Sequence, residues 1–143
     1  MSDNAKKVNM VDAGYEKIQK ITLDFGVAAN ATLAVHTITG AFAPKDHYLT
    51  DATFYVKTAC TSGGSPTLSM GIDSSSEPAD ILSAEALASI DADNDLVGGI
   101  PRQGTDATKI NVGQTALQIY YEIKVAAMTA GKIVVTLIYK PYY

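Results

Sequence analysis

Three aspartates at alternate positions form the densest cluster of potential metal ligands in the sequence. Asp91, Asp93 and Asp95 have the spacing of the first three ligands of a calcium-binding loop. The rest of that pattern is missing, because Leu96 stands where glycine makes the turn and Arg102 where a glutamate chelates the ion. We therefore interpret residues 91–95 as a solvated acidic loop, with a bound cation as the open alternative.

The two histidines and the one cysteine offer little further chemistry. His36 falls in a predicted strand and His47 in a loop, and neither has a second histidine at metal-ligand spacing. Cys60 lies on the inward side of a predicted strand, where it would act as a small buried hydrophobic residue. Because it is the only cysteine, an intrachain disulfide and a site built from several thiolates are excluded. We expect no bound metal and no cofactor.

The sequence contains none of the short motifs that accompany common enzyme chemistry. A nucleophile elbow, a phosphate-binding glycine loop, a zinc-binding helix and a dinucleotide fingerprint are all missing. A catalytic triad built from distant Ser, His and Asp residues is recognised by geometry rather than by order, so it stays open here. The sequence therefore favours a protein that is not an enzyme.

Composition limits the class of protein and its partners. With 143 residues, 47% of them hydrophobic and 18% charged, the chain predicts one globular domain with a substantial core. A net charge of -4 argues against nucleic-acid binding, which needs clustered Lys and Arg. No apolar run approaches the ~18 residues of a membrane span, and no secretory signal pattern opens the chain. We expect a protein made in a cytosol without membrane contact.

The clearest strand pattern lies in residues 117–143. Apolar and polar residues alternate along 117–125 and again along 133–140, which is the period of a half-buried strand. Gly131 supplies a positive-φ position between the two runs, so we expect them to pair as an antiparallel hairpin. The side chains expected to face inward are Leu117, Ile119, Tyr121, Ile123 and Val125 in the first run and Ile133, Val135, Leu137 and Tyr139 in the second.

The upstream chain is expected to cover this hairpin. Alternating residues predict strands at 18–25, 33–39, 49–60 and 67–72, and a short one at 107–112, separated by loops rich in Gly, Pro and Ser. Residues 78–90 are rich in Ala, Leu and Glu at helical spacing and predict one short helix. Residues 1–17 show no sustained period and are interpreted as an N-terminal arm. The expected fold is an antiparallel β-sandwich domain over residues 18–143.

Tyrosines concentrate near the C-terminus and point to a contact surface. Tyr120, Val134 and Ile138 fall on the outward side of the predicted hairpin, where exposed apolar side chains indicate contact with another subunit. The alternative is that a second layer of the same domain covers them. Tyr142 and Tyr143 end the chain, and tyrosine suits partly wet interfaces because it joins an apolar body to a polar tip.

The order of these segments resembles a known family. Residues 18–139, and above all the long strand that runs through a Gly-Ser loop into TLSMGID and the closing MTAGKIVVTLIY, resemble the small jelly-roll virion proteins of tailed bacteriophages. These are the decoration or cement proteins of the capsid and their relatives at the bases of head fibres. The resemblance implies an all-β, antiparallel jelly-roll-like β-sandwich of about eight strands, with one short helix and an extended N-terminal arm.

The same resemblance implies a function and its partners. It implies a structural protein on the capsid surface of a virion, made in the host cytoplasm, that forms a homotrimer and binds the major capsid protein through its arm. The alternative is a head- or tail-fibre module that recognises host surface glycans through Tyr48, Tyr55 or residues 91–95. The resemblance supplies no contact residues; the local pattern alone predicts those at the interfaces, which are Lys6, Lys7, Met10, Tyr120, Val134, Ile138, Tyr142 and Tyr143.

Overall fold

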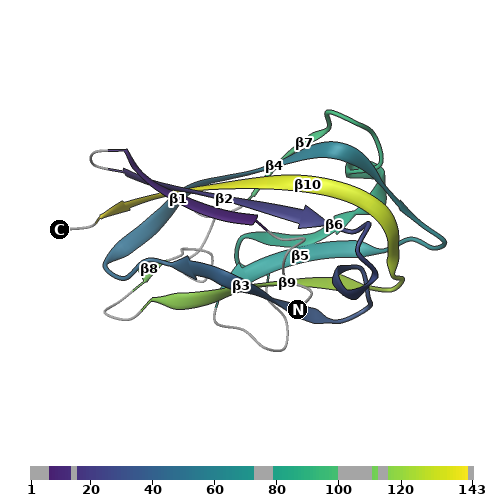
Figure 1. The fold of residues 1–143 in the computed structure, drawn as a ribbon, viewed down its shortest axis with the longest axis horizontal. Helices are drawn as coiled ribbons and strands as arrows, with labels where there is room; N and C mark the ends of the chain where they lie inside the picture. The colour runs from purple at the N-terminus through teal and green to yellow at the C-terminus, as the bar shows by residue number, and fades with distance from the viewer. Residues whose placement is uncertain (1–6, 14–15, 73–78, 100–110, 113–115, 142–143) are drawn as a thin grey trace.

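Two antiparallel β-sheets pack face to face in the computed structural model (Figure 1). The structure describes residues 7–13, 16–72, 79–99, 111–112 and 116–141. One sheet has the strand order β1-β2-β10-β4-β7, with β8 also paired to β4, and the other has the order β3-β9-β5-β6. The strands are β1 (Lys7–Ala13), β2 (Glu16–Asp24), β3 (Val35–Ala43), β4 (His47–Ser62), β5 (Thr67–Ile72), β6 (Leu82–Ala86), β7 (Leu96–Gly98), β8 (Asn111–Val112), β9 (Leu117–Lys124) and β10 (Met128–Pro141).

The strands pair in a nested order around the connection between β5 and β6. β5 pairs with β6, β4 with β7, β3 with β9 and β2 with β10, so the chain folds back on itself like a long hairpin rolled into two layers. Pairing of β10 with β4 and of β9 with β5 then joins these ladders into the two sheets. The antiparallel sandwich predicted from the strand pattern is confirmed, and this nested arrangement is the jelly roll that the family resemblance implied.

Alternation along the strands explains why the sandwich closes around one core. In β10 the side chains of Ile133, Val135, Leu137 and Tyr139 are buried, while the residues between them are half-buried on the outer face. The inner residues of β2, β4, β5 and β9 meet them in one cluster. The prediction of inward faces is therefore confirmed for most of these strands, since period-2 burial follows from the pleat. Val125 is the exception and lies exposed beyond the end of β9.

The predicted C-terminal hairpin is wrong. β9 belongs to the four-stranded sheet and β10 to the six-stranded sheet, and the connection at residues 125–127 carries the chain from one layer to the other. Figure 1 shows β10 curving over at the right-hand end of the sandwich to meet this connection. The pattern identified two strands with one buried face each, but a short link between such strands is compatible both with pairing and with a crossing between layers.

The predicted turn at Gly131 is wrong, because this residue lies inside β10. Its φ of +130° and the register shifts between Ala130 and Lys132 place it in a β-bulge opposite β4. A Cβ at this position would lie 2.6 Å from the Sγ atom of Cys60. Glycine is therefore required here for close approach of two strands rather than for a turn.

The predicted helix at 78–90 is wrong over the described residues 79–90. This segment contains β6, an edge strand paired to β5, and one turn of 3-10 helix at Leu87–Ser89. The Ala84 N–H donates a 2.8 Å hydrogen bond to the Ser69 hydroxyl, and Ile81 and Leu82 are both buried in the sandwich. Pairing with β5 and burial of these two residues override the helical propensity of Ala, Leu and Glu.

The segment predicted as an arm contains a strand in its described part. β1 pairs with β2 without interruption, from Lys7 opposite Thr22 to Ala13 opposite Glu16, and forms an edge of the six-stranded sheet. Residues 1–6 lie outside the described part of the chain. The segment from residue 7 onward is therefore continuous with the sandwich.

Candidate assembly surface

The outer face of the six-stranded sheet carries cross-strand rows that mix apolar and polar side chains. Ile138 of β10 lies opposite Ile18 of β2, and Val134 lies between Thr22 of β2 and Tyr55 of β4. Directly opposed residues of an antiparallel pair bring their Cβ atoms to about 5 Å, so each row forms a continuous strip of side chains. The half-buried Val134 and Ile138 leave apolar surface accessible on this face.

The row through Val134 continues to the edge of the sheet. Tyr55 is 40% exposed and pairs with Leu96 of β7, which is 68% exposed. The Tyr55 hydroxyl donates a hydrogen bond to the Asn94 side chain, so the ring is held over the adjacent loop. The strip Val134–Tyr55–Leu96 is thus ordered apolar surface and the part of this face best suited to contact another protein.

Ion pairs mark both ends of the β2–β10 ladder that underlies this face. The Lys132 Nζ atom lies 3.9 Å from an Asp24 carboxylate oxygen, and the Lys140 Nζ atom lies 3.6 Å from a Glu16 carboxylate oxygen. Exposed pairs of this kind contribute about 0–1 kcal/mol each. Between them the outer face of the ladder carries Thr22, Val134, Thr136, Ile18 and Ile138, together with the exposed Lys20 opposite Thr136.

The structure does not bring the predicted interface residues onto one surface. Tyr120 lies on the outer face of the four-stranded sheet, opposite Thr37 and Gly71, whereas Val134 and Ile138 lie on the outer face of the other sheet. The separation follows directly from the crossing of the chain between β9 and β10. One partner contacting a single face of the sandwich cannot cover all three residues.

The remaining predicted interface residues are placed only in part. Lys7 and Met10 belong to β1, of which the structure describes the backbone pairing. Lys6, Tyr142 and Tyr143 lie outside the described residues. Their assignment to an interface stays a prediction.

The acidic loop at 91–95 packs along β4, and two of its three carboxylates accept backbone hydrogen bonds. The Asp93 carboxylate accepts a 2.7 Å hydrogen bond from the Ala59 N–H, and the Asp95 carboxylate accepts one of 3.2 Å from the Ala92 N–H. Among the residues that the structure describes, no three His, Cys, Asp or Glu side chains gather closely enough to hold a metal ion. No described helix has the length and apolar character needed to cross a membrane.

The histidines and the cysteine occupy separate, structurally explained positions. The His36 ring stacks on Tyr121 at 4.7 Å between ring centroids, and its Nε2 atom lies 2.9 Å from the Thr32 carbonyl oxygen. The buried His47 places its Nδ1 atom 2.7 Å from the Lys45 carbonyl oxygen. Burial raises the pKa of the Cys60 thiol to about 12, so this side chain stays protonated and weakly nucleophilic.

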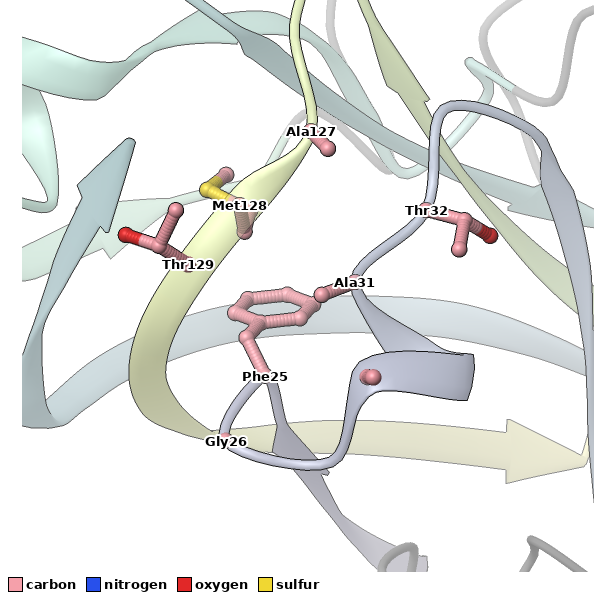
Figure 2. Close-up of a pocket in the computed structure, with 8 residues that line it drawn as sticks. Phe25, Gly26, Ala31, Thr32, Ala127, Met128 and Thr129 are labelled. Atoms are coloured by element: carbon pink, nitrogen blue, oxygen red, sulfur yellow. The ribbon is translucent and has the colours of Figure 1, made fainter. Parts of the chain in front are cut away.

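A hollow of about 360 Å³ opens at one end of the sandwich, between the connection that follows β2 and the start of β10 (Figure 2). The Met128 N–H donates a 3.0 Å hydrogen bond to the Ala31 carbonyl oxygen, which ties its two walls together. Its lining contains no ionisable side chain, and its side-chain polar groups are the hydroxyls of Thr32 and Thr129. The lining residues are Phe25, Gly26, Ala28, Ala31, Thr32, Ala127, Met128 and Thr129.

Several exposed apolar residues were not singled out from the sequence. Leu33, predicted to begin a strand, lies in the connection before β3, and Phe42 and Leu96 are also exposed. The available signal was an isolated large apolar residue within a loop of small ones, as in Ala31-Thr32-Leu33-Ala34. That signal is weak, because single exposed apolar residues are common on protein surfaces.

Comparison with known proteins gives matches at the level of the fold. No family model and no curated protein matches the chain. A chain of the capsid of Ralstonia phage GP4 superposes with a TM-score of 0.64 at 16% identity, covering 100% of this chain and 96% of that one. A chain of the acidic stable capsid of Helicobacter pylori bacteriophage KHP30 superposes with a TM-score of 0.61 at 15% identity, covering 94% and 92%. At these identities the likeness establishes a shared jelly-roll fold.

Proposed function

We propose that this chain is a structural protein of a phage virion, a decoration subunit that binds and stabilises the capsid as a homotrimer. The observation that carries the proposal is the likeness of the whole jelly roll to chains of two phage capsids. The outer face of the six-stranded sheet supports it, since it offers ordered apolar surface around Val134 and Ile138. The protein would act by adding buried interface and has no chemical step to perform.

The energetics of such a role are those of many weak contacts. Each large apolar side chain that becomes buried against the shell contributes about 1.5–3 kcal/mol before the cost of ordering the partners. A trimer presents three such surfaces at once, and linked contacts raise the overall affinity through their effective concentration. Repetition in a trimer would therefore strengthen the contact made by a modest apolar strip such as Val134–Tyr55–Leu96.

The proposal assigns the shell contact to the outer face of the six-stranded sheet and to the chain that precedes β1.

Co-sedimentation tests the contribution of the outer face. Undecorated phage capsids are mixed with purified protein and sedimented, and the protein bound to the capsids is measured. Ile138→Asp is expected to reduce binding at least tenfold, because it places a charge within an apolar contact. Thr37→Asp on the outer face of the other sheet is the matched control and is expected to bind normally. Equal binding by both variants would remove the assignment of this face.

A shortened chain tests the N-terminal contribution. Residues 16 and 17 lie in β2 and residues 7–13 form β1, so deletion of residues 1–17 would also remove part of the sheet. Deletion of residues 1–6 leaves both strands in place and removes Lys6. Weaker co-sedimentation with an unchanged unfolding temperature is the expected result. Undiminished binding would show that this segment has no part in the contact.

A glycan-binding fibre module is the second candidate, and one observation favours it. Tyr55 is exposed beside the Asn94 side chain, and an aromatic ring next to an amide is a combination that can recognise sugars. The carboxylates of the neighbouring loop already accept backbone hydrogen bonds, which leaves fewer groups for a ligand. A glycan array probed with the full chain separates the two candidates, since reproducible binding that Tyr55→Ala abolishes would favour the fibre module.

A further inference from the structure

The strand β1 gives the six-stranded sheet one long, regular edge. β1 lies at the edge of its layer, and β2 is the only described strand that pairs with it (Figure 1). From Lys7 to Ala13 every residue pairs with β2 in unbroken register, without a bulge, a proline or a positive φ. An edge strand of this kind presents backbone N–H and C=O groups to which a further strand can bind.

The opposite edge of the same sheet is closed by the chain itself. Of the described strands, the three-residue β7 and the two-residue β8 lie beyond β4. The Val56 N–H donates a 2.9 Å hydrogen bond to the Asp95 carbonyl oxygen, and the Cys60 N–H donates one of 3.0 Å to the Ile90 carbonyl oxygen. The segment that follows β6 therefore uses the backbone groups that β4 would otherwise offer to another chain.

Both edges of the four-stranded sheet are irregular. The register of β3 shifts in the middle of the strand, where Gly40 has a φ of +84°. The Gln118 Nε2 atom donates hydrogen bonds of 2.7 Å and 3.1 Å to the Ile38 and Ala41 carbonyl oxygens, which fixes this bulge. At the other edge, the five-residue β6 contains Ala84 at a φ of +47° and a register shift. Bulges and short strands disfavour pairing with another chain, so β1 is the best template among the described edges.

We propose that β1 pairs with β1 of a second copy in antiparallel order, so that two six-stranded sheets join edge to edge. Lys7 is the first residue of β1 and Asp12 the last but one, and the residues from Val8 to Val11 between them are uncharged. In antiparallel order the basic end of each strand lies beside the acidic end of the other. In parallel order like charges would lie side by side, which is unfavourable. The order of charges along the strand therefore fits a second copy, and one contact removes two open edges.

Such a contact is compatible with binding of both copies to one shell. Two antiparallel strands of the same sheet, from identical chains, are related by a two-fold axis perpendicular to the sheet. The outer faces that carry Val134 and Ile138 in each copy then point in the same direction. The inference goes beyond the proposed homotrimer, because a two-fold contact joins two copies and would link one trimer to the next.

Disulfide crosslinking of the full chain tests the order of the strands. A two-fold antiparallel pair places a central residue, Asn9 or Met10, opposite its own counterpart at about 4.5–5.5 Å between Cα atoms, which a disulfide can span. The two Lys7 residues would lie about 13–20 Å apart. Under mild oxidation Asn9→Cys or Met10→Cys is expected to form a covalent species of twice 15.1 kDa, and Lys7→Cys is not. The wild type, whose Cys60 is buried, gives the background.

Solution mass across a concentration series measures the strength of the contact. The wild type is expected to associate in pairs as its concentration rises. The double variant Asn9→Lys/Met10→Lys places like charges on the two-fold axis in either register and should weaken association at least tenfold. Thr37→Lys/Thr39→Lys adds the same charge to exposed positions of the edge strand β3 and is the matched control, with the wild-type mass expected. Unfolding temperatures verify that both variants fold.

Three results overturn the inference: no crosslinking at either central position, equal crosslinking by Lys7→Cys, or a wild-type mass for Asn9→Lys/Met10→Lys. Capsid binding by a protein that gives one of these results would leave the decoration role standing. Crosslinked pairs that form as expected but fail to bind capsids, as does the uncrosslinked protein, would overturn that role alone.

Discussion

The Tyr139 hydroxyl donates a 3.1 Å hydrogen bond to the side-chain carbonyl oxygen of Gln19 inside the sandwich. The Gln19 amide group in turn donates to the Phe42 carbonyl oxygen at 3.4 Å, so the chain of bonds runs from β10 through β2 to β3 in the other sheet. Burial raises the pKa of the Tyr139 phenol well above its usual value, which keeps it a donor. Two residues far apart in sequence thereby connect the two layers.

Tyr139→Phe should lower the free energy of unfolding by about 1–3 kcal/mol, because it leaves the buried Gln19 oxygen without its donor. Urea unfolding followed by circular dichroism measures the change. Tyr55→Phe, which removes the hydroxyl of an exposed tyrosine, is the control and should cost less than about 1 kcal/mol. Equal losses for the two variants would contradict a special role for the buried bond.

Gly131→Ala should destabilise the fold by about 3 kcal/mol or more, because the new Cβ would meet Cys60 at 2.6 Å and the residue has a positive φ. Gly40→Ala separates the two causes, since Gly40 also has a positive φ but no atom near its Cβ position. The control should lose about 1–2 kcal/mol from the backbone conformation alone. Similar unfolding midpoints for the two variants would show that the close approach of Cys60 adds no cost beyond that of the positive φ.

The Cys60 thiol makes stability depend on pH above its unfolded pKa. Burial raises its pKa from 9.0 to about 12, so below pH 9 both states are protonated and the thiol adds no pH dependence. Between pH 9 and 12 the unfolded chain releases the proton first, and this group alone lowers the free energy of unfolding by about 1.4 kcal/mol per pH unit. The difference in unfolding free energy between wild type and Cys60→Ala isolates this contribution. A difference that stays constant from pH 8 to pH 11 would contradict the burial of the thiol.

Truncation of two adjacent residues of β10 should lower the free energy of unfolding by very different amounts. Leu137→Ala removes a fully buried side chain and should cost about 2–5 kcal/mol. Thr136→Ala, one position earlier on the outer face, should stay within about 1 kcal/mol. Thermal and urea unfolding measure both. Comparable losses would mean that the outer face is covered in the free protein as well.

Strand positions and buried faces were predictable from local pattern. The alternation of Ile133, Val135 and Leu137 identifies the inner face of β10 because successive side chains of a strand point to opposite sides whatever its partner is. The same reasoning identified β2, β4, β5 and β9. The pattern failed for residues 82–86, where helix-favouring residues pair with β5, because pairing and burial outweigh a propensity of a few tenths of a kcal/mol per residue.

The amino-acid order by itself determined that this protein is built from strands with one apolar face each, and that its composition leaves a surface short of charge. Tertiary structure alone decided which strands pair, because hydrophobic alternation says that a face must be covered and does not say by what. It therefore separated β9 from β10, moved Gly131 from a turn to a contact with Cys60, and placed Tyr120 and Ile138 on opposite outer faces.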